Sequence, residues 1–149
     1  MHVDQSPEDV IRHLGLERHP EGGWYAQTWR DGPHSSAEGP RGVGSSIYYL
    51  LEEGQRSHWH RIDAVEIWHF HTGMPLELSI SGDGKDRSTL LLGQDIKREM
   101  HPQVVVPNTA WPAASAPIGW SLVGCTVSPA FLFETHEMAP KGWLPGKPL

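Results

Sequence analysis

The sequence has one cysteine, no long apolar run and few basic residues. A single cysteine excludes an intrachain disulfide, and the position of Cys125 within the apolar run WSLVGCTV indicates a buried, inert thiol. No run approaches the roughly 18 apolar residues that a membrane helix needs. Twelve Lys and Arg residues against 18 Asp and Glu give a net charge of −6, which disfavours binding to nucleic acid. The first residues, MHVDQSPEDV, lack a secretory pattern, so we expect a cytoplasmic protein.

The hydrophobic pattern predicts one domain over residues 1–149, with a short helix, a barrel and a Pro-rich tail at about residues 7–14, 23–138 and 139–149. Ser6 can cap the helix and Gly15 can end it. Trp143 and Leu144 can dock the tail on the body or on a second subunit. The Gly-, Pro- and Ser-rich residues 31–44 are expected to form a mobile loop near a pocket mouth.

After the helix, apolar and polar residues alternate in short segments separated by Gly, Pro, Asn and Asp, which is typical of β-strands. Asp83-Gly84 suggests a tight type I′ hairpin turn. Many short strands and a single helix predict an all-β sandwich, barrel or jelly roll. The predicted strands are residues 23–30, 45–51, 57–61, 65–71, 75–81, 87–93, 102–107, 111–115, 120–127 and 130–137.

Residues 57–71, SHWHRIDAVEIWHFH, concentrate four histidines around one glutamate. If the two strands of this segment form a hairpin, a three-residue connection sets His60 opposite Glu66, whereas a two-residue connection sets it opposite Ile67. Trp68 and Phe70 lie on the same face of the strand as Glu66. These two side chains are large and apolar, which predicts that this face points to the interior.

We therefore predict that His58, His60 and Glu66 converge inside the barrel, and that His69 and His71 lie outside, at a subunit interface. Two imidazoles and a carboxylate can hold a divalent metal such as Fe, Ni, Zn or Mn. Without metal, the same set can transfer protons near neutral pH. A third interpretation is a buried ion pair with no chemistry.

Two segments resemble the motifs of the cupin superfamily: GQRSHWHRIDAVEIWHFHTG the first and PNTAWPAA the second. Together with HPEGGWYAQTWR, SSIYYLL and WSLVGCTVSPAF, they resemble a family of small cupins of unknown function among the RmlC-like jelly rolls. The resemblance covers about residues 19–138. It implies a double-stranded β-helix barrel, commonly a homodimer, with a ligand pocket in the barrel mouth.

The sequence departs from the cupin pattern at two places. Five residues separate His60 from Glu66, more than the pattern usually has, and Trp111 stands where the second motif usually supplies a metal-binding histidine. A four-ligand metal site is therefore not expected, while three ligands, His58, His60 and Glu66, remain an alternative to no metal.

The function that we predict is proton-transfer chemistry, of an isomerase, epimerase or lyase type, on a sugar derivative or keto acid. His60 would be the base, Glu66 its orienting partner and Tyr48 the acid. The alternatives are a metal-dependent oxygenase or isomerase and a non-catalytic ligand-binding module, and neither nucleic acid nor a membrane is an expected partner. The predicted ligand-contacting residues are Trp59, Trp68, Phe70, Gln103 and Trp111.

Overall fold

The computed structural model describes residues 4–149. Helix α1 (Pro7–Leu14) has the predicted bounds. The Ser6 hydroxyl accepts a hydrogen bond from the backbone N–H of Asp9, whose carboxylate accepts one from the N–H of Ser6 in return. Gly15, at φ 65°, ends the helix. No helix within residues 4–149 is long and apolar enough to cross a membrane.

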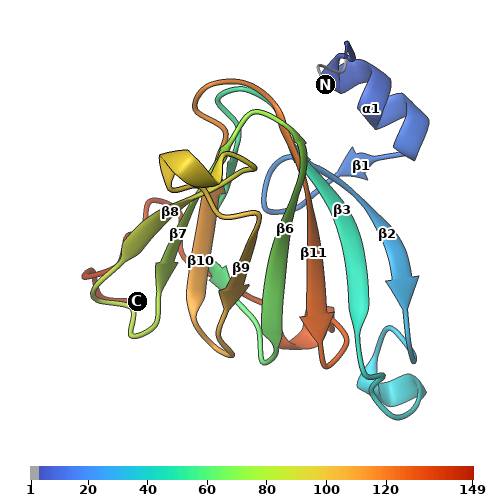
Figure 1. The fold of residues 1–149 in the computed structure, drawn as a ribbon. Coiled ribbons are helices and arrows are strands. Elements are labelled where there is room, and N and C mark those ends of the chain that lie inside the picture. The colour runs from blue at the N-terminus through green and yellow to red at the C-terminus, as the bar shows by residue number, and fades with distance from the viewer. Residues whose placement is uncertain (1–3) are drawn as a thin grey trace.

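Within residues 4–149, two antiparallel sheets contain most of the residues that form strands (Figure 1). The first contains, in spatial order, β1 (Glu17–Arg18), β2 (Trp24–Arg30), β3 (Ser45–Leu51), β11 (Ser121–Ser128), β6 (Val65–Gly73) and β9 (Gln103–Val106). The second contains β4 (Arg56–Ser57), β10 (Trp111–Ser115), β7 (Leu76–Ser81) and β8 (Ser88–Leu92). A separate pair joins β5 (His60–Arg61) to β12 (Glu137–Met138), and three short 3₁₀ turns are η1 (Ser36–Glu38), η2 (Ile96–Arg98) and η3 (Phe133–Thr135). The predicted all-β jelly roll is confirmed.

The main core lies between the two larger sheets. Tyr49, Trp68 and Val123 from the six-stranded sheet pack in one buried cluster with Leu78 and Ala114 from the four-stranded sheet. Burying this apolar surface is the main force that holds the sheets together. On β6 the even-numbered residues face inward, as predicted, so Glu66 is carried into the interior beside Trp68.

The predicted hairpin of residues 57–71 is wrong. The segment 57–61 is interrupted between β4 and β5, and β5 pairs with β12, whereas β6 pairs with β11 and β9. Because the strand is broken between His58 and His60, the two side chains need not point to the same face. Since β5 and β6 are not paired with each other, the number of residues that connect them does not decide which residue faces Glu66.

Two further predictions need correction. Residues 130–137 form no continuous strand, because η3 occupies their centre. The β7–β8 hairpin exists, but its turn is not type I′: only Gly84 has positive φ, while the Asp83 carboxylate accepts hydrogen bonds from the N–H groups of Lys85 and Asp86.

The Pro-rich tail lies against the body of the protein. Trp143 is buried between Trp59 and Trp111, with ring centroids 6.0 and 4.9 Å away, and Leu144 is exposed. The tail therefore packs against β10 of the second sheet through the indole of Trp143.

Candidate active site

A cavity of about 330 Å³ opens over the inner face of the six-stranded sheet. Strands β2, β3, β6 and β11 supply one wall, and the segments around β5 and η3 supply residues facing it. This volume lies in the range of small-molecule sites. Charged and titratable side chains line it together with Tyr25, Tyr49, Trp68, Phe131 and Phe133.

The centre of the site is Glu21, in the turn His19-Pro-Glu-Gly-Gly before β2. Gly22 and Gly23 have φ of 108° and 79°, and a Cβ on Gly22 would lie 2.0 Å from the carbonyl oxygen of Arg56. Only glycine fits there. The Tyr49 hydroxyl donates a hydrogen bond to the carbonyl of Gly22 and thereby fixes the turn from inside. The Glu21 side chain is held in the interior, 7% exposed.

Two histidines share one oxygen of this carboxylate. Glu21 Oε2 lies 3.2 Å from His60 Nδ1 and 2.5 Å from His136 Nε2. The pairing of β5 with β12 brings the histidines together, because Met138 lies opposite His60. The two imidazoles stack with centroids 5.5 Å apart and an interplanar angle of 22°. Burial favours the neutral acid, but the imidazole of His60 and the hydrogen bond from His136 outweigh it and lower the pKa of Glu21.

The contacts of His60 identify its tautomer. Its Nδ1 lies 2.8 Å from the carbonyl oxygen of His58 as well as 3.2 Å from Glu21 Oε2. Both partners are acceptors, so Nδ1 carries a proton and Nε2 holds the lone pair of the neutral ring. Burial opposes a charge on His60, yet the carboxylates of Glu21 and Glu66 and the His58 carbonyl raise its pKa above the ordinary value.

His19 behaves in the opposite way. Its Nδ1 lies 3.4 Å from Glu21 Oε1, an ion-pair distance, but the same nitrogen accepts a hydrogen bond from the backbone N–H of Glu21 at 3.0 Å. A nitrogen that accepts a hydrogen bond carries no proton, so the 3.0 Å contact indicates a neutral His19 ring and the 3.4 Å contact is not a charged pair. Burial, which outweighs the attraction of Glu21, lowers the pKa of His19.

Glu66 is the second buried carboxylate, 7% exposed. Its Oε1 accepts a hydrogen bond from the indole Nε1 of Trp68, two residues along the same face of β6. Burial raises the pKa of Glu66, and the negative charge of Glu21 adds to this effect. The cavity thus combines one carboxylate whose pKa is lowered with one whose pKa is raised.

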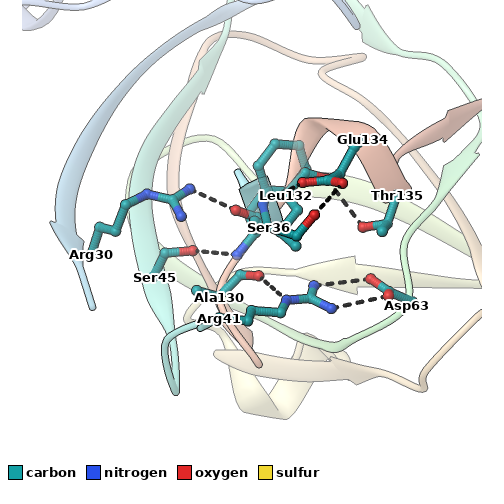
Figure 2. A network of polar contacts seen from close by, with 10 residues as sticks. Arg30, Ser36, Arg41, Ser45, Asp63, Ala130, Leu132, Glu134 and Thr135 are labelled. Carbon is teal, nitrogen blue, oxygen red and sulfur yellow. Dashed lines mark hydrogen bonds and ion pairs between the residues drawn. The ribbon is translucent and has the colours of Figure 1, made fainter. Parts of the chain in front are cut away.

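The opening of the cavity is shaped by residues 31–44 and 129–136, which a polar network joins (Figure 2). Arg41 forms a two-pronged ion pair with Asp63, at 2.9 Å for each bond, and its Nε donates to the carbonyl of Ala130. Glu134 accepts hydrogen bonds from the backbone and hydroxyl of Ser36, both at 2.7 Å. The predicted loop over the pocket mouth is therefore tied at several points to the η3 segment.

The structure brings together only part of the predicted catalytic set. His60 and Glu66 line the same cavity and influence each other's charge. His58 does not join them: its Nε2 donates to the carbonyl of Pro140, 3.1 Å away. Tyr48 lies on the other face of β3, near His71 and α1, so its predicted role as an acid in this cavity is wrong. Tyr49, the next residue, is the inward-facing tyrosine.

Of the predicted ligand-contacting residues, Trp68 lines the cavity. Trp59 and Trp111 are instead packed with Trp143 in the cluster under the tail. Phe70 packs against the core between the sheets. Gln103 is exposed and donates to His69 Nδ1 on the outer face of the sheet, 3.1 Å away.

The predicted metal ligands His58, His60 and Glu66 do not fit a metal. His58 is turned toward the tail, and the His60 Nδ1 proton is directed to acceptors. Within the part of the chain that the structure describes, no group of three or more His, Cys, Asp or Glu side chains could hold a metal ion.

Three residues of the site were missed: His19, Glu21 and His136. The first two lie in HPEGG, where Pro and Gly indicate only a turn, and the third lies in a segment that alternates like a strand. The burial of Glu21 in this turn is visible only in the structure.

Comparisons with known proteins agree with this architecture. The family model described as Cupin superfamily (DUF985) matches residues 8–139. A Shewanella oneidensis protein of known structure is 38% identical, with a TM-score of 0.82 and coverage of 91% of this chain and 85% of that one. A hypothetical protein from Leishmania major is 29% identical, with a TM-score of 0.81 and coverage of 93% and 90%.

Oxalate decarboxylase from Bacillus subtilis shares the fold at 13% identity, with a TM-score of 0.61 and coverage of 81% of this chain and 29% of that chain. No curated protein matches the chain. Since the family model spans the chain from α1 to just beyond β12, the chain belongs to the cupin superfamily, in the family DUF985.

Proposed function

We propose that this cupin is an enzyme that moves protons on a small polar metabolite, a sugar derivative or keto acid, bound in the cavity. The observation that carries the proposal is the buried carboxylate of Glu21, shared by His60 and His136 at the edge of a cavity that His60 also lines. A carboxylate and two imidazoles are a costly way to fill a core. Such groups are concentrated at functional sites.

In this proposal His60 is the base. Its Nδ1 proton is held by acceptors, so Nε2 takes the substrate proton and the ring becomes an imidazolium. Glu21 is a positioning residue: it orients the ring and stabilises the imidazolium, as its effect on the pKa of His60 implies. A base positioned in this way contributes roughly 10² to 10⁴ in rate.

Glu66 is the proposed acid. Its raised pKa keeps a proton on the carboxyl at higher pH than an ordinary glutamate, while its Oε1 is oriented by Trp68. An imidazole in its neutral form can take a proton from one substrate atom, and a carboxyl group in its protonated form can return a proton to another. Isomerisation, epimerisation and elimination all need this pair of steps.

Exchange of substrate C–H for deuterium tests the proposal without knowledge of the product. The protein is incubated in D₂O with a panel of aldoses, uronic acids and 2-keto acids, and the loss of C–H signals is followed by proton NMR. We expect exchange in at least one compound, falling about 100-fold or more in His60→Gln. Tyr48→Phe is the matched control, because Tyr48 lies outside the cavity, and it should leave the exchange rate unchanged.

Two results contradict the proposal. Exchange that persists unchanged in His60→Gln places the chemistry elsewhere. Compounds that bind in the cavity without exchange or turnover identify a ligand-binding module.

A further inference from the structure

We propose that Arg30 binds the carboxylate of the substrate, so that the cavity selects organic acids over neutral sugars and carbonyl compounds. This inference rests on the proposed function, since it names the substrate class of the same cavity. It is carried by a half-buried guanidinium that lines the cavity mouth and whose hydrogen-bond partners are backbone carbonyls.

The guanidinium of Arg30 is held in place but not neutralised. Its Nη2 donates to the carbonyl of Phe131 at 2.7 Å and its Nη1 to the carbonyl of Pro33 at 3.2 Å (Figure 2 shows the Arg30 side chain). Two carbonyl oxygens use two of its five N–H groups and leave the positive charge unpaired. The Nε proton is buried and has no partner among residues 4–149.

Four other arginines within residues 4–149 show the usual arrangement, and three more, Arg18, Arg56 and Arg87, are exposed to solvent. Arg12, Arg41, Arg61 and Arg98 each form an ion pair with an Asp or Glu. Within residues 4–149 no ion pair of this kind involves Arg30, although its side chain faces a cavity rather than open solvent. A fixed guanidinium with free Nη hydrogens matches the two oxygens of a carboxylate.

The register of the sheet places this cation across the cavity from the acid–base groups. Arg30 pairs with Ser45, Ser45 with Val127, and Val127 with Glu66, so Arg30 and Glu66 stand in one row across β2, β3, β11 and β6. Three strand spacings separate their backbones by about 14 Å. Both side chains line the cavity, so a bound molecule can lie between them.

The acidic groups of the cavity do not oppose an anion there. Glu21 is paired with His60 and His136, and burial, which raises the pKa of Glu66, opposes the ionisation of that carboxyl. His34 also lines the cavity. An acid bound with its carboxylate at Arg30 would extend its carbon chain toward His60 and Glu66.

The test compares organic acids with their uncharged counterparts. The probes are glycolate, 2-ketobutyrate and D-glucuronate, each paired with its amide or methyl ester, and dissociation constants come from ligand-observed NMR. We expect the wild-type protein to bind at least one acid about 10- to 100-fold more tightly than its neutral partner, the effect of one charge-assisted hydrogen-bonded pair. In Arg30→Met this preference should fall below about threefold, and Arg30→Lys should restore part of it.

Arg41→Met is the matched control. Arg41 also donates to a backbone carbonyl of the 129–136 segment, that of Ala130, but it does not line the cavity. Its loss should loosen the same segment and leave the preference for acids intact. The inference is overturned if no acid binds, if wild-type protein binds each acid and its neutral partner equally, or if Arg30→Met keeps the preference. If Arg30→Met does not fold, the comparison on wild-type protein can still overturn the inference, and Arg30→Lys then tests the role of the residue.

The failure of this inference can be told apart from the failure of the proposed function. Acids that bind through Arg30 without exchanging their C–H protons would support the carboxylate-binding role of Arg30 and contradict the proposed proton transfer. Exchange of C–H protons in neutral sugars, with no preference for acids, would support the proposed proton transfer and contradict the role of Arg30.

Discussion

Glu21→Gln removes the charge that His60 and His136 share and changes almost nothing in shape. Breaking a buried ion pair from one side costs about 3 to 5 kcal/mol, because the remaining charge loses its partner. Glutamine keeps a carbonyl oxygen that can accept one of the two hydrogen bonds, so we expect the lower end, a loss of about 3 kcal/mol in the free energy of unfolding at pH 6. For a chain of this size that loss lowers the melting temperature by roughly 6 to 12 °C.

The cost should depend on pH in a defined direction. The folded pKa of Glu21 lies below its ordinary 4.5, so its contribution is present above pH 4.5 and is lost as the pH falls through the lower folded value. The folded pKa of His60 lies above its ordinary 6.5, so its contribution is present below pH 6.5 and is lost as the pH rises through the higher folded value. The difference between wild type and Glu21→Gln is therefore largest between about pH 5 and 6.5.

Urea denaturation followed by tryptophan fluorescence at pH 4, 6 and 9 measures this difference. Glu53→Gln, at an exposed position, is the control and should change stability by less than about 0.5 kcal/mol at each pH. A difference below about 1 kcal/mol at pH 6, or one of equal size at pH 6 and pH 9, would refute the shared-charge account of Glu21.

Three further changes test neighbouring parts of the structure. Glu66→Gln should gain stability relative to wild type as pH rises from 5 to 8, because burial, which raises the pKa of Glu66, makes ionisation of the folded wild-type protein costly; urea denaturation at both pH values measures this. Tyr49→Phe should cost about 1 kcal/mol, since it leaves the carbonyl of Gly22 without its donor, whereas Tyr48→Phe should cost less than about 0.5 kcal/mol in the same assay; equal costs would contradict the assignment of the inward tyrosine. Trp143→Ala should cost about 3 to 5 kcal/mol and make the tail sensitive to protease, because its indole is buried against two other indoles, and an unchanged melting temperature would show that the tail contributes no packing.

The fold could be predicted because its signals are local. The cap at Ser6, the alternation along β6, and the Gly and Pro residues between strands each depend on a few neighbouring residues. The burial of Glu66 also followed, since Trp68 and Phe70 fixed which face of β6 points inward.

The site could be predicted only in part, because its residues come from segments that are far apart in sequence. His60 meets Glu21 through a turn stabilised by two glycines, and it meets His136 through the β5–β12 pair. The spacing within residues 57–71 contains no information on either contact. It suggested His58 as a neighbour because the break between β4 and β5 leaves no mark in the alternation of side chains.

NMR titration of the histidines in ¹⁵N-labelled wild-type protein tests most directly whether Glu21 raises the pKa of His60. The structure predicts that His60 titrates above pH 6.5 and keeps its proton on Nδ1 when neutral, while His19 titrates below pH 6.5 with its neutral-form proton on Nε2. A His60 that titrates below His19, or whose neutral ring carries its proton on Nε2, would contradict the account.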